Sequence, residues 1–356
     1  MDRNNIVQYI ENSFLEKLIK DTNVTDISYN GYSIFYLHNA LGRKESDIKI
    51  SNTDARDFIR QISNVTEKQF SYQNPFLDVT AGKYRINATH SSIGRVEESP
   101  SLTFSLRISS YLPRITDETG FLTPELISLF KNIIKNNLSI VIGGATGTGK
   151  TEFQKYLIRK MDKNTRVIVI DNILELSQKQ KELDIDMNVW QADERNTSTS
   201  IQILVKNALR NNPDWLIVAE SRGEEMVEVL NAVMTGHPII TTIHAKDAFS
   251  MPHRLTRMVM MNDKKSNYED VLMDVRDHFP IHVFLKRKIT EEGIVKRYID
   301  SIMVIDEKYQ YQYIYQYQKD EHIYHPLPKS LLKQMEINDD ELFIKTFGGT
   351  KKDENH

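Results

Sequence analysis

An octapeptide near the middle of the chain has the residue types and spacing of a phosphate-binding loop. Residues 144–151 read GATGTGKT and fit the pattern GxxxxGK[ST] in full, and an apolar run at 139–142 precedes them. Such glycines let successive backbone N–H groups turn inward around phosphates, and the dipole of a following helix adds to the attraction. We therefore predict a site for a nucleoside triphosphate, formed by Gly144, Ala145, Thr146, Gly147, Thr148, Gly149, Lys150 and Thr151.

The last two residues of this loop have side chains with distinct expected roles. Lys150 is expected to reach the β- and γ-phosphates, and the hydroxyl of Thr151 is expected to ligate Mg²⁺. The alternative is a glycine-rich turn from strand to helix that binds nothing. The complete octapeptide between a strand and a helix favours the nucleotide.

Hydrolysis of a bound nucleotide also needs a carboxylate that orients water and groups that support the metal. Asp171 and Glu175 follow one apolar run, and Glu220 follows another. Many ATPases carry Asp-Glu at the second position, whereas this chain has Ala219 before Glu220. We therefore expect Glu220 to act as the base and Asp171 to support Mg²⁺. The alternative for each is an ordinary acid at a strand end or helix start.

The elements before the loop are predicted to form a small α+β domain, residues 1–112. Asn30-Gly31 lies between two β-rich runs, which is a strong signal for a hairpin. A helix is expected after a cap at Ser51 or Thr53. The predicted strands are 24–29, 33–37, 76–80, 84–88 and 101–108.

The elements around the loop alternate between strand and helix. Residues 113–123 are interpreted as a linker, and Thr123-Pro124 has the residue types of a helix start. Nearly continuous apolar strands separated by helices predict a parallel sheet covered on both faces, in a domain at 124–320. Residues 321–356 are assigned to a C-terminal tail whose last eight residues are expected to be disordered. The predicted strands are 139–142, 166–170, 215–218 and 239–243, with helices from 149, over 200–210, 224–235, 252–261 and 268–279, and a β-rich part at 281–318.

Composition excludes several classes of protein. The chain has 356 residues, a net charge of −3 and no cysteine, so disulfides and cysteine-ligated zinc or iron–sulfur sites are excluded. The near-neutral charge argues against a surface coated by nucleic acid. The N-terminal residues have no secretory signal, and no apolar run approaches the roughly 18 residues of a spanning helix. We expect a cytoplasmic protein that is at most peripheral to a membrane through partners.

Shorter motifs resemble those of the type II/type IV secretion ATPase superfamily, which powers secretion systems, pili and conjugation machines. Four signatures have counterparts in order: the phosphate loop, an acidic Asp box at Asp171, a Walker B strand that ends in Glu220, and a histidine box. The segments that carry this likeness are LRNNPD (209–214), SRGE (221–224), TGHP (235–238) and TTIHA (241–245). Residues 21–31 and 82–87 resemble the subgroup of type IV secretion traffic ATPases and tight-adherence pilus ATPases, and the likeness covers about residues 15 to 320.

The resemblance implies a RecA-like ATPase domain after a smaller α+β domain and before a β-rich extension. It also implies a hexameric ring that binds ATP and Mg²⁺ between its two domains. Lys150 and Glu220 then act on the nucleotide, and the histidines help to organise the γ-phosphate. The other family positions that match are Arg85 and Arg107, which reach the phosphates, Arg95 as a weaker third, Arg222 in Walker B, and His237 and His244.

The chain departs from the family pattern at two positions. The Asp box usually carries Glu-Asp, whereas this chain has Asp171-Asn172, and Walker B usually has glycine where Ala219 stands. Without cysteine there is no four-cysteine zinc module, which argues against the general-secretion assembly branch. His237 and His244 lack a third ligand, so zinc is not expected.

Four functions stay open on these grounds. The first is a motor of a conjugation-type secretion apparatus that works on inner-membrane partners, and the second is a motor for pilus assembly or retraction. The third is a scaffold that binds ATP with little turnover, and the Asp171-Asn172 change favours it. The fourth is a helicase, which the charge balance disfavours.

Five alternating tyrosines, 309 to 317, predict a strand with one aromatic face, and without basic neighbours this face is expected to pack rather than bind nucleic acid.

Overall fold

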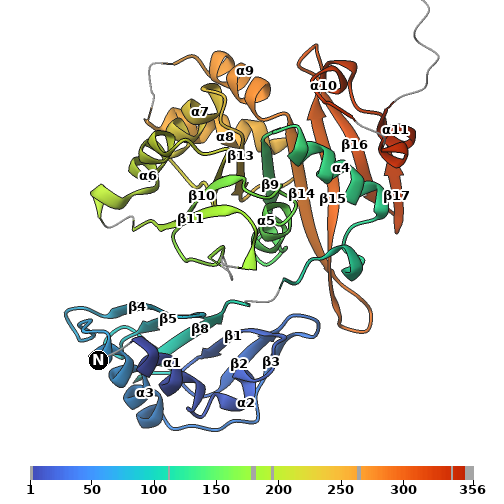
Figure 1. Cartoon of the computed structure of the whole chain (residues 1–356). Helices are drawn as coiled ribbons and strands as arrows, with labels where there is room; N and C mark the ends of the chain where they lie inside the picture. Colours follow the sequence, from blue (N-terminus) through green and yellow to red (C-terminus); the bar gives the residue numbers. More distant parts are fainter. Residues whose placement is uncertain are drawn as a thin grey trace, which may run out of the picture. The chain divides into compact units, whose positions relative to one another are not determined.

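The computed structural model describes residues 3–110, 113–177, 182–193, 196–262, 266–337 and 340–348 (Figure 1). The segment 349–356, for which disorder is expected, lies outside the described residues. The chain forms two compact units. The first unit contains Met1–Leu112 together with Lys288–Lys296, and the second contains Pro113–Arg287 and Arg297–His356. Residues 288–296 are therefore part of the first unit although the sequence around them belongs to the second.

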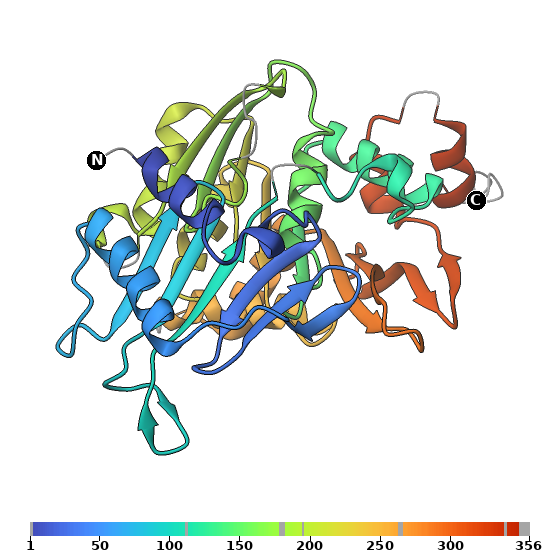
Figure 2. The ribbon, with the colours of Figure 1, turned by 90° about the horizontal axis from the view of Figure 1, so that it is seen from below.

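The first unit is a six-stranded antiparallel sheet with its helices on one face (Figures 1 and 2). Buried and exposed side chains alternate along its strands, so one face packs against the helices and the other is polar. The sheet order is β3 (Gly42–Glu45), β2 (Ile34–His38), β1 (Val24–Tyr29), β8 (Thr103–Ile108), β5 (Tyr84–Thr89) and β4 (Phe76–Ala81). The helices are α1 (Arg3–Glu11), α2 (Glu16–Ile19) and α3 (Asn52–Val65), and a small ribbon is formed by β6 (Arg95–Val96) and β7 (Ser99–Pro100).

Local sequence signals account for most of these elements. The hairpin at Asn30-Gly31 is present, with Gly31 at a φ of +106°. Ser51 caps α3, because its hydroxyl accepts from the Asp54 N–H while the Asp54 carboxylate accepts from the Ser51 N–H. The sequence analysis did not predict α1, α2 or β3.

The second unit contains a nine-stranded mixed sheet. The strands from β11 to β14 in the sheet order are parallel. Beyond them, β15 pairs with β16 and β16 with β17 in antiparallel fashion, and these strands form the β-rich part. The family-level expectation of a parallel sheet followed by a β-rich region is therefore confirmed. The order is β11 (Asp186–Gln191), β10 (Arg166–Asp171), β12 (Trp215–Val218), β13 (Ile239–Ile243), β9 (Ile140–Gly144), β14 (Ile281–Ile289), β15 (Val295–Ile305), β16 (Tyr311–Gln318) and β17 (Glu321–Tyr324).

Two separate cores cover the two faces of this sheet. In β9, Ile140 and Ile142 belong to one core, while Val141 between them belongs to the other. This explains why β12, for example, is apolar at every position. The first core is closed by α4 (Pro124–Lys135), α5 (Lys150–Ile158), α10 (Lys329–Lys333) and α11 (Glu341–Phe347), and the second by α6 (Ile201–Ala208), α7 (Met226–Met234), α8 (Ser250–Asn262) and α9 (Tyr268–His278).

The described part of the segment assigned to a tail packs into the first core. Phe343 and Phe347 of α11 are fully buried there, and Asp340 accepts hydrogen bonds from Ser128 and Asn132 of α4. These helices are too short for an apolar period in the sequence to predict them. The edge strand β11, in which polar and apolar residues are mixed, was not predicted either.

The prediction of one aromatic face for the tyrosine run is wrong. Ile302 pairs with Tyr315 and Met303 with Tyr313, so Ile314 is an extra residue in β16. Such a bulge reverses the faces of the residues on either side of it. Tyr313 therefore packs against one core while Ile314 and Tyr315 are buried in the other. Tyr309 precedes the strand, at a φ of +58°.

A histidine is fully buried in the central sheet. His282 of β14 lies opposite Val141 of β9, and neither of its ring nitrogens has a hydrogen-bond partner among the described residues. Burial lowers the pKa of His282 to about 3, so the ring stays neutral at every physiological pH.

We predict that this histidine makes the second unit acid-sensitive. Between pH 6.5 and 3 the unfolded chain binds a proton at His282 that the folded chain does not bind. The free energy of unfolding therefore falls as the pH is lowered through this window, by up to about 1.4 kcal/mol for each pH unit. Both tryptophans, Trp190 and Trp215, lie in the second unit, so their fluorescence during denaturant unfolding measures it. His282→Leu should give a shallower pH dependence, and parallel curves for the two proteins would contradict the prediction.

Candidate functional site

The phosphate loop joins β9 to α5 and contains glycines in conformations that other residues adopt only with strain. Gly144 and Gly149 have φ values of +152° and +98°. A Cβ on Gly144 would lie 2.6 Å from the carbonyl oxygen of Leu285 in β14. Inside the loop, the hydroxyl of Thr148 donates to the Ala145 carbonyl oxygen at 2.9 Å. Positive φ values at both glycines, and close packing at Gly144, therefore favour glycine at these positions.

Lys150 lies along this loop. Its Nζ donates to the carbonyl oxygens of Gly144 and Ala145 at 2.9 and 3.1 Å. Burial lowers the pKa of Lys150, Arg222 lowers it further, and Glu220 opposes both effects. Thr151 follows, half-buried in the first turn of α5. The hydroxyl of Thr151, the ammonium group of Lys150 and the turned loop backbone are the groups that a Mg²⁺–nucleotide requires.

Parallel pairing brings the ends of neighbouring strands to the same edge of the sheet as the loop. Glu220 is the second residue after the end of β12, and His244 is the first residue after β13. One carboxylate oxygen of Glu220, Oε2, accepts from Nη2 of Arg222 at 2.7 Å. The other, Oε1, lies 3.0 Å from Nε2 of His244 but has no hydrogen bond with a described residue. The structure thus brings together Lys150, Glu220, Arg222 and His244.

The electrostatics keep Glu220 ionised. Burial alone would raise the pKa of Glu220, and this is the largest single effect on it. The hydrogen bond and charge of Arg222, together with the charges of His244 and Lys150, outweigh burial and lower that pKa below its ordinary value. The carboxylate is therefore charged over the whole neutral range.

Hydrogen bonds from neighbouring strands fix the backbone around Glu220. The hydroxyl of Thr242 donates to the Ala219 carbonyl oxygen at 2.7 Å, and the Ala219 N–H donates to Ile170 at 2.9 Å. The side chain of Gln154 in α5 donates to the Val218 carbonyl oxygen at 3.1 Å. Because α5 begins at the phosphate loop, Gln154 links the position of the loop to the strand that carries Glu220.

Asp171 lies at the same edge, but its carboxylate accepts hydrogen bonds from the turn that follows it. Its Oδ1 accepts from the Ile173 N–H at 2.9 Å and its Oδ2 from the Leu176 N–H at 3.0 Å. The side chain is buried, and Glu175 lies half-buried in the turn that these bonds organise. This geometry fits a role in folding the turn better than the predicted role in supporting Mg²⁺. Among the described residues, no three His, Asp or Glu side chains form a group that could hold a metal.

His237 is not at this edge. It lies before β13, and its Nδ1 is 3.1 Å from the hydroxyl of Thr235 at the end of α7. The strand separates His237 from His244 by seven residues, which span roughly 20 Å in extended chain. Within one chain His237 therefore lies away from the phosphate loop, and its role at the γ-phosphate stays a prediction.

Two predicted arginines of the first unit, Arg85 and Arg107, lie on the polar face of its sheet. Arg85 and Arg107 are direct partners across β5 and β8. Arg85 pairs with Asp78, and Arg107 pairs with Asp26, each at 3.1 Å. Arg95 lies apart from them on β6, where it donates to the carbonyl oxygens of Ser91 and Gly94.

Two residues beside the loop were missed by the sequence analysis. Nε of Arg297 in β15 donates to the Gly147 carbonyl oxygen at 2.8 Å, and Arg287 in β14 lies against the same glycine. Neither belongs to a motif. Their place depends on the pairing of β14 with β9, in which Leu285 is opposite Gly144, and no local signal reveals that pairing.

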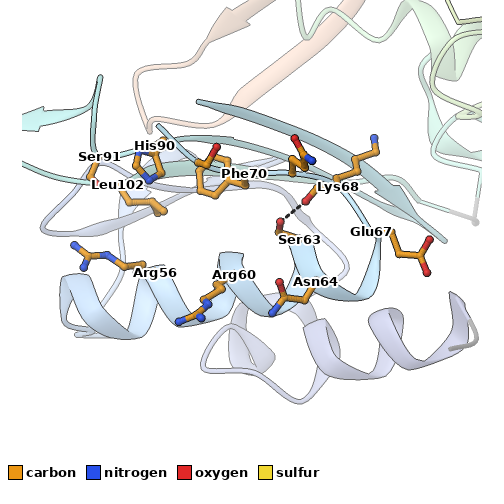
Figure 3. A pocket seen from close by; sticks show the side chains of 12 residues that line it. Arg56, Arg60, Ser63, Asn64, Glu67, Lys68, Phe70, His90, Ser91 and Leu102 are labelled. Atoms are coloured by element: carbon orange, nitrogen blue, oxygen red, sulfur yellow. Dashed lines mark hydrogen bonds between the residues drawn. The ribbon is translucent and has the colours of Figure 1, made fainter. Parts of the chain in front are cut away.

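A separate pocket lies in the first unit, between α3 and the end of the sheet (Figure 3). Its volume is about 570 Å³, and Arg56 and Arg60 of α3 are at its rim. The ring of Phe70 packs edge-on against His90 at a centroid distance of 5.3 Å. The pocket contains none of the predicted site residues.

Comparisons with known proteins agree with this architecture. The family model described as "Type II/IV secretion system protein" matches residues 104–276, a range that contains the loop, Glu220 and His244. An uncharacterized protein of Bacillus anthracis is 32% identical over 313 residues, which cover 85% of this chain and 69% of that protein. The conjugal transfer protein TrbB of Rhizobium radiobacter is 28% identical over 170 residues, 46% of this chain and 50% of that protein. The solved structure of the Legionella pneumophila ATPase DotB has the same fold, with 22% identity and a TM-score of 0.62 over 83% of this chain and 80% of that one.

The fold is that of an α/β protein with a glycine-rich loop at the carboxyl edge of a parallel sheet. The chain belongs to the type II/type IV secretion ATPase superfamily.

The close approach at Gly144 gives a prediction about stability. Gly144→Ala should lower the unfolding free energy of the second unit by about 3 kcal/mol, because it adds a steric clash to an unfavourable φ. Gly236→Ala is the matched control, since Gly236 also has a positive φ, +92°, but a Cβ there would meet nothing within 4 Å. Its expected cost is about 1 kcal/mol. Tryptophan fluorescence during denaturation measures the unfolding free energy of both variants. Equal losses of unfolding free energy would show that the contact with Leu285 does not add to the cost at Gly144.

Proposed function

We propose that this protein hydrolyses ATP to power a conjugation-type (type IV) secretion apparatus. The observation that carries the proposal is the ionised Glu220 at the same sheet edge as the complete phosphate loop, beside Lys150. The family supports an ATPase, and the relative named as a conjugal transfer protein supports the choice of apparatus. A pilus motor would use the same residues, and only its partners would differ.

In this proposal the loop N–H groups and Lys150 hold the β- and γ-phosphates. The hydroxyl of Thr151 holds Mg²⁺, which when bound neutralises charge on the phosphates. Glu220 accepts a hydrogen bond from the attacking water through Oε1, while Arg222 fixes Oε2. His244, 3.0 Å from Oε1, orients that water or the γ-phosphate.

The proposal extends to an assembly of six chains. In the ring, Arg85 and Arg107 exchange their aspartate partners for nucleotide phosphate, which a guanidinium binds through two parallel hydrogen bonds. None of the described helices is long and apolar enough to cross a membrane. We propose that the protein works in the cytoplasm and reaches the inner membrane through components of the secretion machine.

A second candidate is a scaffold that binds ATP with little turnover. The hydrogen bonds of Asp171 favour it, because both carboxylate oxygens are occupied within the turn and the next residue is Asn172. The metal would then be held by Thr151 and the nucleotide alone.

The two candidates differ in the effect of Glu220→Gln. For the ATPase, this variant should bind ATP normally but release phosphate at least about 100-fold more slowly, because a general base contributes that much or more. Lys150→Ala should lose nucleotide binding. Glu321→Gln, an exposed acid on β17, is the control and should match the wild type. A Glu220→Gln variant with wild-type turnover would exclude the proposed mechanism, and a wild type as slow as this variant would favour the scaffold.

The pKa of Glu220 gives a second test of the mechanism. Its lowered pKa should leave turnover independent of Glu220 ionisation until the pH falls below the ordinary carboxyl range. Arg222→Gln removes the hydrogen bond and the charge, so the pKa should rise and the acidic limb of kcat/KM should move to higher pH. The pH profile of ATP hydrolysis measures this shift. An unchanged acidic limb would show that Arg222 does not set the ionisation of the base.

A further inference from the structure

A glycine inside the phosphate loop is explained by its neighbours rather than by the motif. Gly147 stands at a position where the motif accepts any residue. Its φ is +76°, and a Cβ on it would lie 3.0 Å from Nη1 of Arg287. Arg297 donates through Nε to the carbonyl oxygen of the same residue at 2.8 Å. Two guanidinium groups therefore lie directly against the loop that is expected to hold the phosphates.

These arginines come from two strands of one hairpin. Arg287 is near the end of β14, which runs parallel to β9 and beside the loop, and Arg297 is near the start of β15. A Cβ on Gly149 would also lie 3.7 Å from Cδ of Arg297, so the arginine extends along the loop from Gly147 to Gly149. Their positions thus follow from the main-chain pairing of the sheet.

Two other arginines lie close enough to Arg297 to act on its charge. Burial lowers the pKa of Arg297, and the nearby charges of Arg287 and Arg114 lower it further. Three cations that repel one another gain from an anion placed among them. Guanidinium groups suit phosphate in particular, since their planar N–H groups match two of its oxygens. A nucleotide in the loop would bring that anion.

We propose that Arg287 and Arg297 bind the phosphates of the nucleotide held by the loop of their own chain. They form a second cationic group on the side of the loop where β14 lies, in addition to Lys150. This inference rests on the proposed nucleotide site. It assigns to the β14–β15 hairpin a direct part in nucleotide affinity.

The affinity of the purified chain for fluorescent analogues of ATP, ADP and AMP tests this proposal. Arg287→Gln is the cleaner variant, because the hydrogen bond to Gly147 comes from Arg297. We expect Arg287→Gln and Arg297→Gln each to weaken ATP binding about 10-fold, which is the loss of one charge-assisted hydrogen bond. The loss should shrink from ATP to ADP to AMP as phosphate charge is removed. Arg254→Gln, an exposed arginine on α8, is the control and should bind as the wild type does.

Two further measurements separate binding from folding. The melting temperature without nucleotide should stay within about 2 °C of the wild type for Arg287→Gln, as for an exposed side chain. Arg297→Lys should restore part of the ATP affinity if charge is what matters. Equal losses for ATP and AMP, or wild-type affinity in both glutamine variants, would overturn the inference. If instead the wild type binds no ATP, or Lys150→Ala binds ATP with the affinity of the wild type, the proposed function itself fails.

Discussion

The parallel pairing of β10, β12, β13, β9 and β14 is the constraint on which the rest of the structure depends. It places the carboxyl ends of five strands at one edge of the sheet, where the loop after β9 turns into α5. Glu220 and His244 meet at this edge although they come from different strands. The hydrogen bonds from Thr242 and Gln154 then hold the strand that carries Glu220 in register with the loop. In such a site the sheet positions the functional side chains, and the loops contribute mainly the glycines.

The charges at the edge follow from that arrangement. Lys150 and Arg222 both lower the pKa of Glu220, so a half-buried carboxylate stays ionised where burial alone would favour its protonated form. Beside the loop, Arg287 and Arg297 add two positive charges to that of Lys150. The hairpin that carries Arg297 continues into residues 288–296, which belong to the first unit and bond to it from Val295 to Ala40. The two units are therefore joined covalently three times, at residue 113 and at both strands of this hairpin.

Local sequence signals predicted much of this fold. Features that depend on contacts between distant segments were not predicted. The sequence predicts the octapeptide loop, the Ser51 cap and the central apolar strands, because each depends on residues within a few positions of one another. The pairing of β14 with β9 joins segments about 140 residues apart, so Arg287 could not be placed beside the loop. The bulge at Ile314 reflects packing against two cores, which a period-two pattern does not reveal. Asp171 was recognised as an acid at the right edge, but its bonds to the following turn appear only in three dimensions.

The central claim is that this edge of the sheet hydrolyses ATP when chains assemble. Phosphate release per chain, measured over a wide range of protein concentration with Glu220→Gln in parallel, tests it most directly. The account predicts turnover that rises with concentration until assembly is complete, and no such rise in the variant. Wild-type turnover that equals that of Glu220→Gln at every concentration would contradict it.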